Sequence, residues 1–286
     1  MSAAADATLR APSRLMIFAR NRGAVVAAAI LVALLVLAAI GPVIAPFDPD
    51  KIGVGSAMAA PGWPHLMGTD ELGRDVASRV LGGVRVSLLV GLGAAAIATG
   101  LGVLVGGVAG FFGRFVDDAL MRITEIFQVV PRFFLAVLLV AFFGASILNI
   151  VLAIALLSWP EMARIVRAEF LSLRGRQFVD AARVAGASAA TLIFLEILPN
   201  ALGPVIVNAT LQVGQAMLLE AGLSYLGLGD PSQISLGLML HQAQSIMRSA
   251  WWATTFPGVM IFLAVLSLNL IGDGLTDVLN PRSRGR

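Results

Sequence analysis

Five stretches of this 286-residue chain contain no charged residue, and each is longer than the roughly 20 residues that an α-helix needs to cross a bilayer. These stretches are residues 24–47, 86–113, 133–160, 197–219 and 249–272. Only 13% of all residues are charged, whereas a soluble domain usually carries about 25%. A single compact core could not bury so much apolar surface, so the sequence predicts an all-α, polytopic membrane protein.

Arginines gather at both ends of the chain, which indicates that both ends lie in the cytoplasm. They are Arg10, Arg14, Arg20 and Arg22 before the first stretch and Arg282, Arg284 and Arg286 after the last. Two cytoplasmic ends require an even number of spans. The third stretch can supply the sixth, because its apolar character extends back to residue 119 and residues 144–146 form a turn signal. We therefore expect six spans, at residues 24–46, 86–111, 119–143, 147–164, 200–222 and 253–273.

The expected cytoplasmic loop, residues 165–199, has the composition of an ordered segment rather than of a flexible linker. Residues 177–185 favour a helix, and Gly186 follows where a left-handed C-cap would lie. Ser188 can cap a second helix, and Pro199 fits the start of the next span. The first helix either rests on lipid headgroups or presents a surface to an acidic partner.

The second stretch carries glycines at a spacing of four residues, Gly102, Gly106 and Gly110. A dinucleotide-binding loop would place its glycines between a strand and a helix, whereas these lie within an apolar run. Small residues at this spacing let two helices approach closely in lipid. We therefore expect helix packing here and no phosphate site.

The composition argues against nucleotide, metal and nucleic-acid sites. Among the 20 Lys and Arg residues the only lysine is Lys51, which follows no glycine-rich turn, so the chain lacks a P-loop for ATP. There is no cysteine, and the two histidines, His65 and His241, are far apart, which disfavours a metal site. The arginines lie mostly between apolar runs, so orientation in a membrane explains the net charge of +3 better than nucleic-acid binding does.

A few ionisable residues lie within or beside the expected spans, where charge is costly. Arg122 and Glu125 are three residues apart and can pair on one helix face, or they can serve as gating or subunit contacts. No partner for Arg132 is evident. Asp273 and Asp277 are four residues apart and require cationic partners, either from the arginines of the cytoplasmic loop or from another subunit.

Within the cytoplasmic loop, Asp180-Ala181-Ala182, Gly186 and Glu196-Ile197-Leu198-Pro199 resemble the EAA loop of ABC importer permeases. In that family the loop forms a coupling helix that docks into a groove of the ATP-binding subunit. Asp180 replaces the usual glutamate, and Glu196 the usual histidine. The resemblance implies a coupling helix at about residues 177–186. It also implies the ATPase-coupling residues Phe178, Asp180, Ala181, Ala182, Gly186, Leu198 and Pro199.

Three further motifs, at residues 68–75, 223–229 and 272–277, resemble the dipeptide/oligopeptide/nickel branch of these permeases, in particular its second, C-type subunit. The resemblance implies a type I importer fold with six transmembrane helices in a bacterial inner membrane. The chain would then divide into a cytoplasmic tail (1–22), a first helix with its periplasmic loop (23–85) and a permease core of five helices (86–286).

The same resemblance implies a pore-forming subunit with no catalytic residue and no cofactor of its own. A homologous permease would complete the heterodimer, two ATP-binding subunits would hold ATP and Mg²⁺, and a periplasmic or lipid-anchored solute-binding protein would deliver peptides. Two alternatives stay open: a permease for nickel or a metal chelate, and an ion-coupled secondary transporter that uses intramembrane carboxylates such as Glu125.

Overall fold

The computed structural model describes residues 18–19 and 21–279, and the regular structure of these residues is helical. Most of the tail expected over residues 1–22 and the C-terminal residues 280–286 lie outside the described residues. The helices are α2 (Arg22–Ile44), α3 (Val76–Phe112), α4 (Arg114–Val129), α5 (Arg132–Phe143), α6 (Ile147–Leu173), α7 (Gln177–Val184), α8 (Ala189–Thr191), α9 (Leu198–Leu223), α10 (Leu236–Gln242) and α11 (Trp252–Leu279).

Five helical rods are long and apolar enough to cross a membrane: α2, α3, α6, α11 and the rod over Ala189–Leu228 that contains α8 and α9. A π-helical segment, Leu192–Ile197, joins α8 to α9 within that rod. Taken together as one bent span, α4 and α5 make a sixth. The expectation of an all-α protein with six spans is therefore confirmed, with the third span bent.

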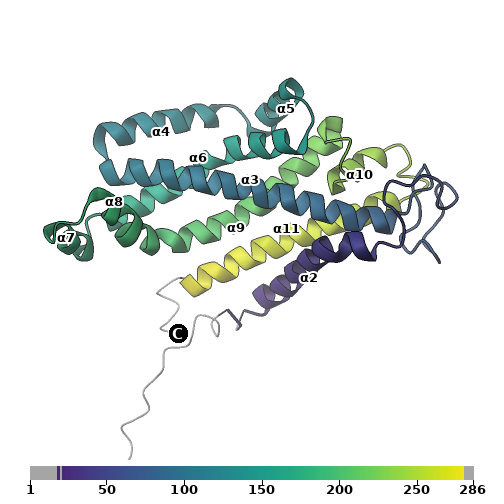
Figure 1. The fold of residues 1–286 in the computed structure, drawn as a ribbon, viewed down its shortest axis with the longest axis horizontal. Helices are drawn as coiled ribbons and strands as arrows, with labels where there is room; N and C mark the ends of the chain where they lie inside the picture. The colour runs from purple at the N-terminus through teal and green to yellow at the C-terminus, as the bar shows by residue number, and fades with distance from the viewer. Residues whose placement is uncertain (1–17, 20, 280–286) are drawn as a thin grey trace, which may run out of the picture.

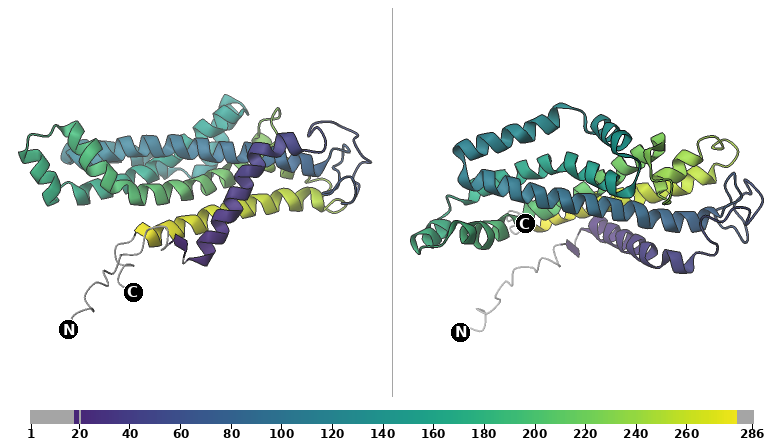
Figure 2. Two further views of the ribbon diagram at one scale, coloured as in Figure 1. Left: turned by 60° about the horizontal axis from the view of Figure 1, so that its bottom comes forward. Right: turned by 45° about the horizontal axis from the view of Figure 1, so that its top comes forward.

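The long helices lie side by side along the longest axis of the molecule (Figure 1). Helices α7 and α8 lie at one end, called here the α7 end. The irregular segment 45–75 and α10 lie at the opposite end, called the loop end. Helix α2 runs toward the loop end and α11 runs back from it, as both views in Figure 2 show. This course fits an even number of crossings.

The second span belongs to a helix that begins ten residues before the expected start at residue 86. Asp75 caps α3 by accepting a hydrogen bond from the backbone N–H of Ser78 at 2.8 Å, so the helix starts at Val76. Residues 76–85, expected to lie in an outer loop, are helical. The expected boundary between residues 85 and 86 thus falls inside α3.

The third span is two helices, contrary to the single helix expected over residues 119–143. The axes of α4 and α5 meet at 83°. Pro131 offers no N–H to continue the α4 ladder, and Val130 before it is extended, with φ −92° and ψ 136°. Proline therefore terminates α4, and α5 starts in a new direction at Arg132.

Glycines let α3 lie directly against α6, as their spacing predicted. A Cβ atom on Gly106 would overlap the carbonyl oxygen of Ala163, and one on Gly110 would lie 2.8 Å from the carbonyl oxygen of Arg167. Contacts between backbones this close are open only to glycine, and they supply the packing that holds helices together where lipid removes the hydrophobic driving force. Helices α3 and α6 thus form the centre of the bundle.

Replacing Gly106 with alanine should destabilise the protein by about 1–3 kcal/mol, because α3 and α6 must separate to admit the methyl group. Thermal unfolding of the purified protein in detergent measures this loss. The matched control is Gly100→Ala on the same helix, where a Cβ meets no atom within 4 Å. Equal midpoints for the two variants would contradict the close contact.

Candidate functional site

Helix α7 attaches to the α7 end of the bundle through one buried side chain. Val179 has no exposed surface and packs in a cluster with Phe170 of α6 and with Leu192 and Ile197 of the long rod. It is the only buried residue of α7. The remaining face of the helix is therefore free to meet another molecule.

The end of α7 is built as its sequence predicted. Gly186 adopts a φ of +86°, in the left-handed region. The N–H of Gly186 donates to the carbonyl of Arg183, and the N–H of Ala187 donates to that of Ala182, both at 3.1 Å. These two bonds make a Schellman motif. Ser188 then caps α8 by accepting from the N–H of Thr191 at 3.2 Å.

The outer surface of α7 combines apolar and charged side chains. Phe178, Ala181 and Gly186 are exposed, and the side chain of Val184 has 90% of its surface free. Its one ion pair joins Arg183 Nη1 to Asp180 Oδ1 at 2.7 Å, and both side chains are about half exposed. Such a surface can dock against a partner without a large desolvation cost.

The structure brings together most, but not all, of the predicted coupling residues. Phe178, Asp180, Ala181, Ala182 and Gly186 share α7 and its cap, whereas Leu198 and Pro199 lie at the start of α9. Leu198 packs against the interior cluster around Val179, and Pro199 lines a separate groove of about 730 Å³. These two residues therefore support the rod rather than the exposed surface of α7.

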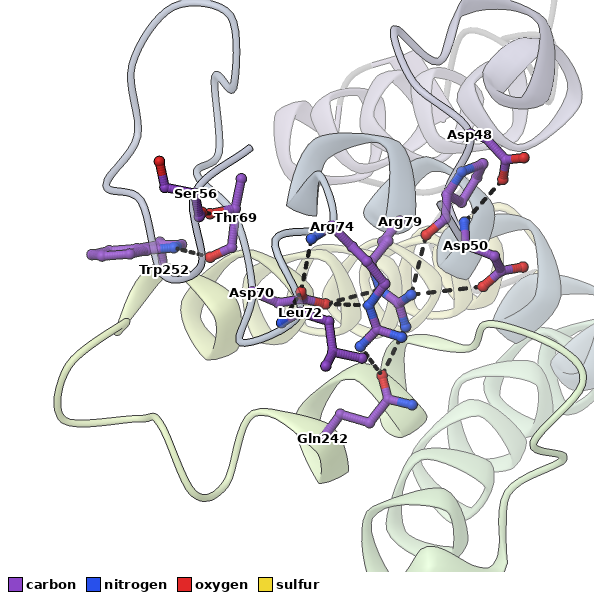
Figure 3. Close-up of polar contacts among 11 residues, drawn as sticks. Asp48, Asp50, Ser56, Thr69, Asp70, Leu72, Arg74, Arg79, Gln242 and Trp252 are labelled. Carbon is purple, nitrogen blue, oxygen red and sulfur yellow. Dashed lines mark hydrogen bonds and ion pairs between the residues drawn. The ribbon is translucent and has the colours of Figure 1, made fainter. Parts of the chain in front are cut away.

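At the loop end, a buried polar cluster ties the 45–75 segment to the helices (Figure 3). Arg74 Nε lies 2.6 Å from Asp70 Oδ2, and the side chains of Arg74 and Arg79 both donate to Gln242 Oε1 of α10, at 3.2 and 2.7 Å. Arg79 is 2% exposed and also donates to the carbonyl of Pro49 at 3.1 Å. The cluster joins α3, α10 and the loop.

A second set of contacts fixes the same loop to α3 and α11. His65 Nδ1 lies 2.9 Å from Asp75 Oδ1, and the indole N–H of Trp252 donates to the carbonyl of Thr69 at 3.0 Å. His65 is thus part of the loop framework. His241 lies 2.9 Å from the carbonyl of Tyr225, and no group of three metal-ligating side chains occurs within residues 21–279.

A loop carboxylate also holds the start of α6. Burial alone would raise the pKa of Asp230, but hydrogen bonds from the hydroxyl and N–H of Ser232 and from the N–H of Ile147 lower the pKa below its ordinary value. The carboxylate therefore stays ionised at neutral pH and fixes the connection between the long rod and α6.

Glu220 lies within the span expected over residues 200–222, and its structural role was missed from the sequence. It is 2% exposed, and its carboxylate accepts from the hydroxyls of Ser87 at 2.9 Å and Ser224 at 2.7 Å. The Ser87 hydroxyl in turn accepts from the N–H of Leu236 at 3.2 Å. One buried carboxylate thereby links α3, the long rod and α10. The sequence signal was a lone glutamate that follows an apolar run.

The predicted pairing of Arg122 with Glu125 is wrong: within the described part of the chain, neither side chain forms an ion pair or a hydrogen bond. Both are exposed on α4. Arg132, for which no partner was evident from the sequence, donates to Glu161 Oε2 on α6 at 2.8 Å. Spacing along one helix did not predict this contact because it crosses between two helices.

The two carboxylates at the end of α11 are both exposed. Asp277 Oδ2 accepts a hydrogen bond at 3.1 Å from the side chain of Asn21, which also caps α2. The structure thus gives Asp277 a contact with the start of α2, and α7 lies at a separate corner of the bundle (Figure 1).

Comparisons with known proteins give a consistent result. The family described as "Binding-protein-dependent transport system inner membrane component" matches residues 102–285, and the "N-terminal TM domain of oligopeptide transport permease C" matches residues 14–61. The sequence is 41% identical to a putative peptide permease protein of Brucella suis, over 93% of this chain and 89% of that one.

Two further comparisons agree. The sequence is 39% identical to the di/tripeptide transport system permease protein DppC of Pseudomonas aeruginosa, over 98% of this chain and 96% of that one. The fold is similar to a chain of the MetNI methionine ABC transporter in an inward-facing conformation. The TM-score is 0.56 and the identity 18%, and the match covers 69% of this chain and 96% of that one.

Replacing Arg79 with methionine should lower stability by about 3 kcal/mol, because the carbonyl of Pro49 loses its donor and the Asp70 carboxylate loses a nearby cation. Thermal unfolding in detergent would show the loss. Lys51→Met is the matched control, since the exposed Lys51 side chain forms no ion pair within residues 21–279 and its removal should change the midpoint little. A similar midpoint for both variants would show that the cluster is not structural.

Proposed function

Because the chain belongs to the family of binding-protein-dependent transport system inner membrane components, and is thus the permease subunit of an ABC importer with the type I fold, we propose that it forms half of a pathway for short peptides. A second, homologous permease supplies the other half. Two ATPase subunits, which hold ATP and Mg²⁺, drive the transport.

The observation that carries the peptide assignment is the nearly full-length similarity to relatives named for peptides, at 35–41% identity. This similarity covers both the loop end and the α7 end. It favours peptides over the nickel alternative. The family itself is binding-protein-dependent, which sets aside an ion-coupled secondary transporter.

The surface of α7 is the contact for an ATPase subunit in this proposal. It projects from the bundle (Figure 1), and the small exposed Ala181 leaves room for another backbone to approach. Phe178, Asp180, Ala181, Ala182 and Gly186 contribute this surface or hold its shape. Two exposed arginines, Arg176 just before α7 and Arg183 on it, suit an acidic partner.

Movement at α7 can reach two spans at once. Val179 belongs to one buried cluster with Phe170 of α6 and with Leu192 and Ile197 of the rod that continues into α9. A displacement of α7 therefore acts on α6 and on the long rod together, while the glycine contact keeps α6 against α3. The bundle is in this way suited to switch between two arrangements of rigid helices.

The α7 end faces the cytoplasm and the loop end faces the periplasm in this proposal. The excess of arginine near α7 supports this orientation. The loop end then receives a periplasmic or lipid-anchored solute-binding protein. The buried Asp70, Arg74 and Arg79 cluster gives that protein a fixed platform, because it ties the 45–75 segment to α3 and α10.

The native complex, purified and reconstituted in proteoliposomes with its binding protein, should take up radiolabelled dialanine in an ATP-dependent, vanadate-sensitive manner. Mass spectrometry of the same preparation should find a second permease and two ATPase subunits. Uptake of Ni²⁺ without uptake of dialanine would replace the peptide assignment by the metal one. Uptake that is insensitive to vanadate would refute the ATP-driven mechanism.

Replacing Val184 with aspartate should reduce recovery of the ATPase subunits with the permease roughly tenfold or more, since it places an unpaired charge in the proposed contact. Val184 is almost fully exposed, so the bundle itself should fold normally. Ile52→Asp, an exposed apolar position at the loop end, is the matched control and should leave the complex intact. Undiminished ATPase recovery with Val184→Asp would show that this face of α7 does not dock.

A further inference from the structure

Two ion pairs join α4 and α5 to α6. They lie at the two ends of the space between α4 and α6, called here the seam. Arg167 of α6 holds Asp117 at the first turn of α4 with both its Nε and its Nη2, the latter 2.7 Å from Asp117 Oδ2. Farther along, Arg132 at the start of α5 pairs with Glu161 of α6 at 2.8 Å. The carboxylate lies on α4 in the first pair and on α6 in the second, so the two pairs have opposite charge directions across the seam.

Between these pairs lies a polar groove of about 470 Å³. Helix α4 contributes Asp118, Arg122 and Glu125 to its lining, and α6 contributes Arg164 and Arg167. Arg164 is three residues from both Glu161 and Arg167, so it lies midway between the two ion pairs. A groove of this volume is within the range of small-molecule sites.

The charges in the groove are available to a ligand. Arg122, Glu125 and Arg164 are exposed, and none of them forms an ion pair or a hydrogen bond with any residue in the described part of the chain. Ionised side chains on spanning helices are costly unless they face a water-filled cavity or a partner, and they often mark substrate pathways. The open groove supplies the water, and the missing partner is what a ligand can provide.

The mixture of signs selects the kind of ligand. A site for an anion or a lipid phosphate would gather cations alone, whereas here three guanidinium groups, one of them held by Asp117, face the same space as two carboxylates. Arg122 and Arg164 can bind a carboxylate, for which guanidinium geometry is well suited. Glu125, one turn beyond Arg122 on α4, can accept hydrogen bonds from an ammonium group. The complementary ligand is a small zwitterion.

We infer that this groove binds a short peptide in transit, with the peptide's C-terminal carboxylate on Arg122 and Arg164 and its N-terminal ammonium on Glu125. The inference rests on the proposed function and adds to it a place of contact and a basis for selection. Recognition of the two termini alone would leave the peptide side chains free. One groove could then pass peptides of many sequences.

Binding of dialanine to the purified complex tests the inference, with the binding protein and nucleotide left out so that only the permease can select. In isothermal titration calorimetry of the complex in nanodiscs, Arg122→Gln and Arg164→Gln should each weaken the binding of dialanine at least tenfold. Both variants should leave the affinity for the C-terminal amide of dialanine unchanged. Glu125→Gln should lower the affinity for dialanine but not the affinity for N-acetyl-dialanine. The matched control is Arg248→Gln, an exposed arginine at the loop end, which should have no effect.

Equal affinity for dialanine and its amide in the unmodified complex would overturn the inference, as would unchanged dialanine affinity in both arginine variants. Loss of the second permease from the Arg122→Gln complex would overturn it too, and would identify the groove as a subunit contact. Uptake of dialanine by the unmodified complex in proteoliposomes is measured separately. If that uptake occurs while the variants bind normally, the groove inference fails and the proposed function stands.

Discussion

The contact between α3 and α6 is the interaction on which the rest of the bundle depends. Lipid removes the hydrophobic force that packs helices in water, so close backbone approach must supply the attraction. Gly102, Gly106 and Gly110 present such a surface to Met162, Ala163 and Phe170. Because α6 is held in this way, it can serve as the fixed side of the seam with α4 and as one support of α7.

The polar side chains of the bundle fall into two kinds, which differ in burial and in the number of their partners. At the loop end, Arg79 and Asp70 are buried and have several partners each, as buried ionised groups require. In the groove near the α7 end, Arg122 and Arg164 have open surroundings instead. The first kind fixes the loop end of the molecule. The second leaves charged groups accessible in the groove between α4 and α6, and an ion pair lies at each border of that groove.

Much of the fold was predictable because long uncharged stretches have few alternatives to transmembrane helices. The Schellman end at Gly186 and the cap at Ser188 also followed from local chemistry. The early start of α3 was missed because Arg79 and Arg85 suggested a loop, although the capping pattern of Asp75 and Ser78 was present.

The candidate sites were less predictable, for a physical reason. Spacing along one helix permits a pair such as Arg122 with Glu125 but does not decide it against contacts with other helices. Arg132 pairs with Glu161, which is 29 residues away in sequence, only because Pro131 redirects the chain. The groove between α4 and α6 is likewise formed by residues from two helices, and no local pattern encodes a space between helices.

The π-helical segment at Leu192–Ile197 gives the long rod a tolerance in chain length. A π turn contains about one residue more than an α turn but completes the same full rotation, so the segment holds an extra residue while α8 and α9 keep their relative facing. Deleting one residue there would restore regular α-helix and would leave the facing of α9 relative to α8 nearly unchanged. Deleting one residue within the regular part of α9 would instead turn the two parts of that helix against each other by about 100°. This rod can thus lose a residue at one place without losing the alignment of its two ends.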